Sequence, residues 1–411
     1  MKYAGVILLM FVMVSMRSYA ATNDYHSYLK TVLDNAESVK SKEALVDAEE
    51  LHKLSTQLYA VPKVSASITP KKSKANTNKQ YVESKITLTS LLFEDTLFSN
   101  IKAQNYKLLA SVVELDKEKE RITTVIMSDQ IHISLYEKLR DNAVQLKREA
   151  ESLYEKINVK YDFGIIKESD VQLAKLLVQK INNEIDSIEH AIDRLKINIE
   201  SNALYPYPTE GIRIENSKID ALLKFNNKES ALVNNFDLRK LSLSKDEVKE
   251  NARQQDSLLS VSIVAENKWN DDKTVKEDSY VGLRLSLNVF DLDNKLAKSA
   301  GIENYKSLSW DYDHKYKLLL NQTKLAKLTS EANTREISNL ERQYKTTKEL
   351  IKNQEREYGI NQVSIYEMLN TRFDLFQIEK SITEMKVSEA KNKINLLQVY
   401  GQVLDFFMGE T

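Results

Sequence analysis

The chain has 411 residues, of which 29% are charged, with a formal net charge of -1 and no cysteine. The lack of cysteine excludes disulfide bonds, cysteine-ligated zinc and thiol chemistry, and the balanced charge argues against nucleic acid as a partner. Only eight glycines and four prolines interrupt the chain, so long helices are expected to dominate it.

Residues 1–20 have the pattern of a secretory signal peptide. Lys2 precedes an apolar run at 4–16, and Ser-Tyr-Ala at 18–20 has the small residues of a cleavage site. The alternative is a membrane anchor, but the run is too short to cross a hydrocarbon layer of about 30 Å. We therefore expect cleavage after residue 20 and export of the mature chain.

The remainder of the chain is predicted to contain two repeats. Adding 197 to a residue number between 93 and 197 gives a chemically similar residue without a gap, as with Tyr161 and Tyr358. Each copy runs in the order strand pair, very long helix, tight turn, long helix. The predicted units are a first repeat at 21–202, a linker at 203–215, a second repeat at 216–405 and a C-terminal tail at 406–411.

Within each repeat, the period of the apolar residues changes from helical to strand-like and back. A spacing of three and four predicts helices, and strict alternation predicts strands with one apolar and one wet face. The first repeat is predicted to have N-terminal helices, strands at about 61–69 and 80–92, and a helical hairpin at 98–202. The second repeat is predicted to have short helices, strands at about 257–269 and 279–290, and a helical hairpin at 295–400.

The predicted strands have the length that a tilted strand needs to cross a bilayer, about ten residues. Aromatic residues near the strand ends are candidates for two membrane-interface girdles, although ordinary use of aromatic residues in strands is the alternative. The girdle candidates are Trp269, Tyr280, Tyr81, Phe93 and Phe290. Four strands cannot close a membrane barrel, so the strands either lie outside a membrane or are pooled by several chains. Three chains would give twelve strands.

The two hairpin turns differ in the residues that form them. In the first turn, Gly164 adopts a left-handed backbone freely, and Ser169 fits the N-cap of the returning helix with Asp170 beside it. In the second turn, Asn361 takes the place of the glycine and Glu367 lies near the helix start. The alternative reading is that these polar residues only cap helices.

With these elements in place, the chain resembles the TolC family of outer-membrane efflux and secretion channels over essentially its whole mature length. The most specific stretch is the first turn, 163–174, where a glycine is followed by serine, an acid and valine at the family's spacing. Asn235-Phe236-Asp237-Leu238 is similar to the family's Asn-Pro-Glu-Leu, and 61–64 to its Leu-Pro-x-Leu. The family's Phe-Asp-Gly-Gly is present only as Phe93-Glu94-Asp95 and Phe290-Asp291-Leu292.

The resemblance implies a mainly α fold with a small β part. Long antiparallel coiled-coil hairpins would form a periplasmic tube, and four strands per chain would contribute to a trimeric 12-stranded barrel in the outer membrane of a Gram-negative cell. The homotrimer would contact outer-membrane lipid and a periplasmic adaptor, or membrane fusion protein. Through the adaptor it would serve an inner-membrane RND, MFS or ABC transporter, in efflux or in type I secretion.

The resemblance also assigns roles to residues of the hairpin turns. Glu367 matches one acid of the pore constriction, while Asn370 stands in place of the second. Asp170 and Tyr358 match a pair that holds the periplasmic tip closed, and Ser169 matches half of another pair. The arginine expected in that second pair is Val363 here.

Two other classes of protein are possible on the sequence alone. A soluble periplasmic coiled-coil adaptor or scaffold would also have a signal peptide, but two hairpins and four strands of bilayer length argue against it. An enzyme is disfavoured because the chain has no glycine-rich phosphate loop and its histidines lack zinc spacing. We therefore expect no catalytic residue, no cofactor and no metal. The histidines are His26, His52, His132, His190 and His314.

Overall fold

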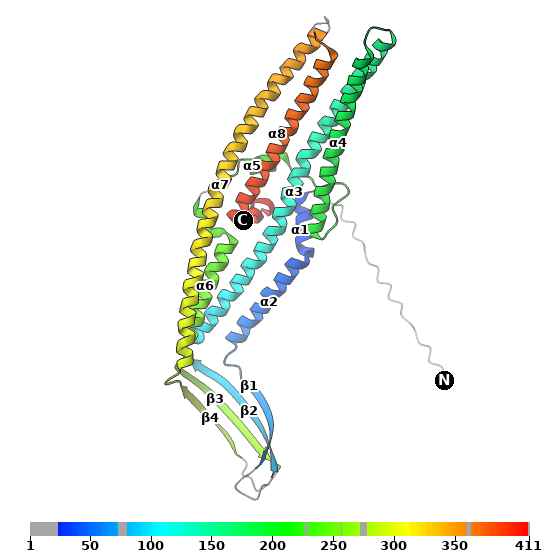
Figure 1. The fold of residues 1–411 in the computed structure, drawn as a ribbon. Helices are drawn as coiled ribbons and strands as arrows, with labels where there is room; N and C mark the ends of the chain where they lie inside the picture. Colours follow the sequence, from blue (N-terminus) through cyan, green and yellow to red (C-terminus); the bar gives the residue numbers. More distant parts are fainter. Residues whose placement is uncertain are drawn as a thin grey trace, which may run out of the picture.

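The structure, a computed structural model, describes residues 24–72, 80–226, 229–255, 257–271, 278–358 and 363–409. Its helices form a long rod with a four-stranded sheet at one end, and two helical hairpins reach the opposite end (Figure 1). Short helices and the C-terminus lie near the middle of the rod. The fold is therefore mainly α with a small β part, as predicted, while the predicted signal peptide at 1–20 lies outside the described residues.

The elements follow one another in the predicted order. The first half contains α1 Tyr25–Asn35, α2 Glu37–Gln57, β1 Lys63–Lys72, β2 Gln80–Glu94, α3 Leu97–Asp162 and α4 Glu168–Ala203. The middle contains α5 Asn216–Leu223, the 3-10 helix η1 Glu229–Asn234 and α6 Phe236–Gln254. The second half contains β3 Leu259–Asn270, β4 Ser279–Leu287, α7 Leu292–Tyr358, α8 Ile365–Val399 and α9 Val403–Met408. Residues 406–408, predicted as part of a tail, belong to α9 because Phe407 is completely buried.

The sheet has the order β1-β2-β3-β4 with every neighbouring pair antiparallel. Its central pair, β2 and β3, comes from different halves of the chain, so the sheet joins the two halves. A bulge at Leu92 shifts the register between Leu91 and Phe93. Extra residues of this kind change which side chains face each side of a sheet.

The first hairpin packs through an apolar stripe. Helix α3 has 66 residues, which at 1.5 Å per residue gives a length of about 100 Å. The buried residues of α4 recur every three or four positions, so they form one face along the helix. They are Ala174, Leu177, Ile181, Ile185, Ile188, Ile192, Ile199 and Ala203. This stripe faces α3 over most of its length.

The second hairpin has a more polar core. Helix α7 has 67 residues, and its buried residues are Leu319, Thr323, Asn333 and Gln354. On the partner helix α8, Glu389 and Lys393 are buried among ten buried apolar residues, so the polar positions lie mainly where α8 meets α7. The two hairpins thus have nearly the same lengths and quite different interiors.

Candidate functional site

The sheet has one apolar face that the other described residues leave uncovered. Residues opposite one another in neighbouring strands share a face, and this rule places the apolar residues of all four strands together. Their exposed fractions reach 74% at Ile68 and 78% at Val281. The largest exposed members are Val64, Ile68, Val82, Ile86, Val281, Leu283, Leu285 and Leu287. A continuous apolar surface of this kind marks a contact with protein or membrane.

The aromatic girdle candidates divide between the two faces. Trp269 lies opposite Ser84 and belongs to the apolar face, and the bulge places Phe93 on that face opposite Val261. Tyr81 and Tyr280 lie on the other face, opposite Lys71 and Glu266, because side chains alternate along a strand. A lipid-facing girdle can therefore include Trp269 and Phe93 but not the two tyrosines.

The fifth girdle candidate, Phe290, follows the last residue of β4 and precedes α7. The polar face of the sheet carries ion pairs beside Tyr280, which lies opposite Glu266. Lys85 and Lys268 both contact the buried carboxylate of Glu266, at 2.5 and 2.7 Å. One face is thus apolar and the other charged, as in a sheet that separates lipid from water.

The first hairpin turn has the predicted glycine but not the predicted N-cap. Gly164 has φ +69°, the left-handed conformation that ends a helix at low cost in glycine. Helix α4 begins at Glu168, so Lys167 is the N-cap residue and Ser169 lies inside the first turn. The N-cap prediction for Ser169 is therefore wrong by two positions. Asp170 also lies in this first turn, where a negative charge is favourable.

The second turn has the better-capped helix. Asn361, predicted in the glycine position, lies outside the described residues. Ser364 is the N-cap of α8, and its hydroxyl accepts a hydrogen bond from the Glu367 N–H at 3.2 Å. The Glu367 carboxylate accepts in return from the Ser364 N–H at 3.3 Å, which completes a capping box. Glu367 is exposed and Asn370, one turn later, is half-buried.

The predicted latch pair is not joined within one chain. The Tyr358 hydroxyl accepts a hydrogen bond from Lys160 at 2.9 Å, and the same ammonium lies 5.1 Å from the tyrosine ring centroid. Among the described contacts, none links Tyr358 to Asp170. Lys160 lies in the last turn of α3 and Tyr358 ends α7, so this contact does connect the tips of the two hairpins.

Polar contacts below the tips also join the hairpins, and the sequence did not reveal them. The Arg372 guanidinium on α8 contacts Glu149 on α3 at 3.1 Å and Glu355 on α7 at 2.6 Å. Glu184 on α4 accepts from Lys380 at 2.8 Å and from Gln377 at 3.1 Å, both on α8. These polar contacts accompany apolar packing between the hairpins, since α8 residues such as Phe376 and Ile394 belong to the same buried cluster as residues of α3 and α4.

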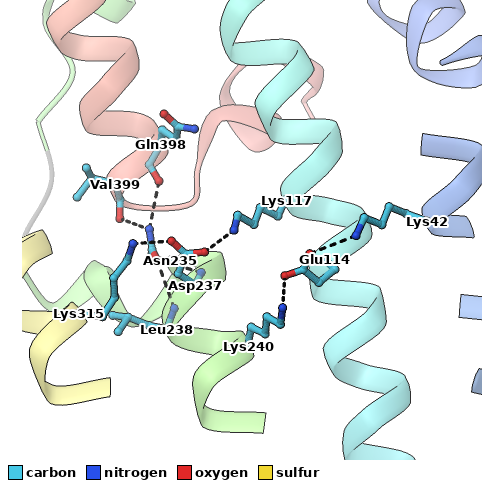
Figure 2. Close-up of polar contacts among 10 residues, drawn as sticks. All are labelled: Lys42, Glu114, Lys117, Asn235, Asp237, Leu238, Lys240, Lys315, Gln398 and Val399. Carbon is cyan, nitrogen blue, oxygen red and sulfur yellow. Dashed lines mark hydrogen bonds and ion pairs between the residues drawn. The ribbon is translucent and has the colours of Figure 1, made fainter. Parts of the chain in front are cut away.

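A second set of polar contacts joins four helices at the middle of the rod (Figure 2). Asn235 caps α6 by accepting from two backbone N–H groups, and its amide donates to the Val399 carbonyl of α8 at 3.1 Å. Asp237 contacts Lys117 of α3 at 2.7 Å and Lys315 of α7 at 2.6 Å. Burial opposes ionisation of Asp237, but hydrogen bonds from the two lysines outweigh it and hold its pKa below the usual value.

Glu120 of α3 lies near this cluster and is almost fully buried. Its carboxylate accepts a hydrogen bond from the Val403 N–H at the start of α9, at 3.3 Å. Burial raises the pKa of Glu120 to about 8, and the carboxylates of Asp237 and Asp405 act in the same direction. The middle of the rod therefore holds one carboxyl group whose pKa is raised, Glu120, and one whose pKa is lowered, Asp237.

The described residues show no arrangement that would hold a metal ion, since no three His, Asp or Glu side chains gather closely enough. None of the described helices is long and apolar enough to cross a membrane.

Comparisons with known proteins place this geometry in a known fold. No family model matches the sequence, and no curated protein matches it. Solved structures do match. The outer membrane protein VceC of Vibrio cholerae has a TM-score of 0.72 at 12% identity, over 91% of this chain and 95% of that one. The Campylobacter jejuni CmeC outer membrane channel has a TM-score of 0.67 at 13% identity, over 95% and 88%.

A third match is the open state of the Neisseria gonorrhoeae MtrE outer membrane channel. Its TM-score is 0.69 at 13% identity, over 93% of this chain and 90% of that chain. The chain therefore has the fold of outer-membrane channels. That fold is the one of the TolC family, as the sequence resemblance predicted.

Proposed function

We propose that this chain is the outer-membrane channel subunit of a tripartite efflux pump or a type I secretion system. It conducts solutes passively from the periplasm, or from an inner-membrane transporter, to the exterior. The observation that carries this proposal is the uncovered apolar face of the sheet, on a chain with the fold of outer-membrane channels. Its functional state is a homotrimer, and it performs no chemistry and needs no cofactor.

The free edges of the sheet support the trimer. Within the described residues, β1 and β4 each pair along one edge only, and an unpaired edge in lipid is strongly unfavourable. If β4 of one copy pairs with β1 of the next, three copies close a barrel of twelve strands. Helix α7 also has large apolar residues exposed in the single chain, such as Trp310, Leu325 and Leu328, which a neighbouring copy would cover in part.

The hairpins then form the periplasmic tube, with the turns at its far end. Three copies of Glu367 make an acidic ring that favours cations, although the carboxylate also completes a helix cap. Asp170 and Tyr358, not joined within one chain, are candidates for contacts that keep the tip closed between copies. The tube is the surface that a periplasmic adaptor and an RND, MFS or ABC transporter engage.

The proposal is tested by isolating the full chain from membranes. We expect it in the outer-membrane fraction, as a complex with the mass of three chains whose gel migration changes on heating. Reconstituted in planar bilayers, the complex should produce stepwise conductance. Recovery of a soluble periplasmic monomer without conductance would contradict the proposal and favour an adaptor or scaffold.

A further inference from the structure

The apolar surface of the sheet does not end with strand β4. The residues that follow the strand are among the most exposed apolar residues of the chain. Their exposed fractions are 91% at Val289, 75% at Phe290, 58% at Leu292 and 62% at Leu296. The last two belong to the start of α7, so an apolar surface passes from a strand to a helix.

The start of α7 has a packed face and an uncovered face. Asn294, Lys298 and Gly301 are partly buried, and Gly301 packs so closely on Ala252 of α6 that a Cβ there would lie 2.8 Å from the alanine methyl group. A helix turns once every 3.6 residues, so Leu292 and Leu296 lie on the side of α7 opposite these residues. They are therefore directed away from the chain's own helices.

The apolar part of β4 is short for a bilayer. Its apolar residues run from Val281 to Leu287, seven residues that extend about 24 Å at 3.4 Å each. With a tilt near 45°, the height is about 17 Å, whereas the apolar band of a membrane barrel is about 25 Å tall. Residues 288–290 add about 7 Å to this height if they are extended at the same tilt, so the start of α7 lies at the edge of the apolar band.

Charged residues show where the apolar surface ends. The Lys295 ammonium lies 5.3 Å from the centroid of the Phe290 ring, so its stem covers apolar surface while its charge remains at the edge. About two to three turns further, on the same uncovered side, Glu303 and Lys306 form a 2.8 Å ion pair in which both side chains are mostly exposed. A solvated ion pair is expected in water and not under another apolar surface.

We propose that the first turn of α7 is a lipid-binding surface that extends the membrane contact beyond the strands. Leu292 and Leu296 reach the acyl chains of the periplasmic leaflet, and Lys295 lies at the level of the phospholipid phosphates. The proposal rests on the proposed function, because only a sheet inside the membrane places α7 at a leaflet. The alternative is that a second copy of the chain contacts this surface instead of lipid, and the test below distinguishes the two contacts.

The chain has two tryptophans, Trp269 and Trp310, which make a direct test possible. Trp269 lies on the apolar face of the sheet, and Trp310 lies on the same side of α7 as Leu292 but about five turns further along. Three variants each keep one tryptophan: Trp310→Phe, Trp269→Phe, and Trp269→Phe with Trp310→Phe and Leu296→Trp. Each is reconstituted as the full complex in vesicles of phosphatidylcholine with bromine on its acyl chains or without it.

We expect the tryptophan at position 296 to lose about half of its emission in brominated lipid, because it lies at the boundary of headgroups and chains. Bromine near the headgroup end of the chain should quench it more than bromine near the methyl end. Trp269 should also be quenched, and Trp310 should not. Leu292→Trp in the same background should repeat the result of Leu296→Trp.

Quenching of Trp269 without quenching at 296 and 292 would overturn the inference and leave the proposed function intact. A blue-shifted emission at 296 that bromine does not change would show that a second copy covers the surface. If Trp269 is not quenched either, the sheet is outside the membrane and the proposed function fails as well. Heat-dependent gel migration of each variant shows that it has assembled before the emission is compared.

Discussion

The two helical hairpins have nearly the same lengths, but several buried apolar positions of the first are polar in the second. Ile192 of α4 is buried among apolar residues, whereas Glu389, the residue 197 positions later, is equally buried on α8. The same change recurs along the hairpins: Ile126, Ile133 and Ile157 in the first correspond to Thr323, Ser330 and Gln354 in the second. The Glu389 carboxylate is held by Ser330, by Asn333 at 2.9 Å and by Lys393 at 3.5 Å.

This difference shows that a hairpin of given length can be held by packing or by polar contacts. Apolar burial stabilises in proportion to the area removed from water, whereas a buried ionic network contributes little net stability and instead fixes which residues are opposed. We infer that the first hairpin is the stable support of the rod. The second hairpin, with few buried residues on α7, depends more on its polar contacts, on the packing of α8 against the first hairpin and on neighbouring copies.

The largest effect should come from replacing a buried isoleucine of the first hairpin with the glutamate that the second hairpin has at the corresponding position. Ile192→Glu places a carboxylate in an apolar interior without the partners that Glu389 has, at a cost of at least about 3 kcal/mol. Thermal unfolding of the purified complex in detergent measures the change. Ile197→Glu is the matched control, because Ile197 lies on the same helix with 60% of its surface exposed. Equal midpoints for the two variants would show that the comparison of interiors is wrong.

The ends of the hairpins differ in a similar way. Leu204 follows the last residue of α4 as its C-cap with φ +49°, and 197 residues later the same left-handed conformation is taken by Gly401 with φ +64°. A Cβ at Gly401 would lie 2.5 Å from the Asn234 carbonyl oxygen, so Gly401→Ala should cost about 2 to 3 kcal/mol. Gly164→Ala has the left-handed φ but open space, and should cost only about 1 kcal/mol.

In the opposite direction, Leu204→Gly should stabilise the first hairpin by about 0.5 kcal/mol, because it removes backbone strain from an exposed leucine. The unfolding midpoints should therefore be lowest for Gly401→Ala, higher for Gly164→Ala and highest for Leu204→Gly. If Gly401→Ala costs no more than Gly164→Ala, the close contact between Gly401 and Asn234 does not exist in solution.

The contact between α3 and α9 predicts a pH effect. The raised pKa of Glu120 means that the folded chain keeps a proton that the unfolded chain loses between about pH 4.5 and about 8. Stability should therefore fall as pH rises through this window. Glu120→Gln should remove about 1 to 2 kcal/mol of this fall. One unit of pKa shift is worth about 1.4 kcal/mol, and relaxation of the structure around the charged carboxylate reduces the full effect of the shift. If the stability of the unmodified protein and of Glu120→Gln changes with pH in the same way, the raised pKa of Glu120 is contradicted.

For Asp237, the same experiment should show the opposite dependence of stability on pH. Its pKa is lowered, so its contribution to stability is present at neutral pH and is lost as the solution becomes acidic. Asp237→Asn should therefore lower stability at neutral pH and flatten the acidic part of the profile.

The smallest effect is expected at the hairpin turns. Ser364→Ala removes the N-cap of α8 and should cost about 1 kcal/mol, whereas Ser169→Ala changes a residue inside α4 and should cost close to nothing. Unfolding midpoints of the two variants measure the difference. A larger cost at Ser169 would restore that residue to the N-cap role that its sequence position suggested.

The sequence predicted the fold because each element has a local signal. The alternation in 257–269 and 279–290 and the apolar spacing in α4 can be recognised without knowledge of the partners. The bulge at Leu92 and the start of α4 at Glu168 have no such signal, since each depends on a shift of one or two residues. The faces of Tyr81 and Tyr280 were available in the alternation itself, because both residues fall in step with Glu83, Arg284 and their charged neighbours.

Contacts between hairpins could not be predicted in the same way. Arg372 and Glu149 are separated by 223 positions, and their meeting depends on how far α8 lies along α3. The change from Ile192 to Glu389 was visible in the repeat, but its partners Ser330 and Asn333 become evident only when α7 and α8 are paired. Local periodicity therefore defines elements, and three-dimensional packing defines the candidate sites between them.

The central claim is that one face of the sheet contacts lipid and the other contacts water. The chain has no cysteine, so Leu283→Cys and Arg284→Cys each introduce a single thiol on neighbouring residues of opposite faces. In vesicles holding the assembled channel, a charged maleimide that cannot enter lipid should modify the cysteine at 284 and leave the one at 283 unmodified. Equal modification of the two cysteines would contradict the account.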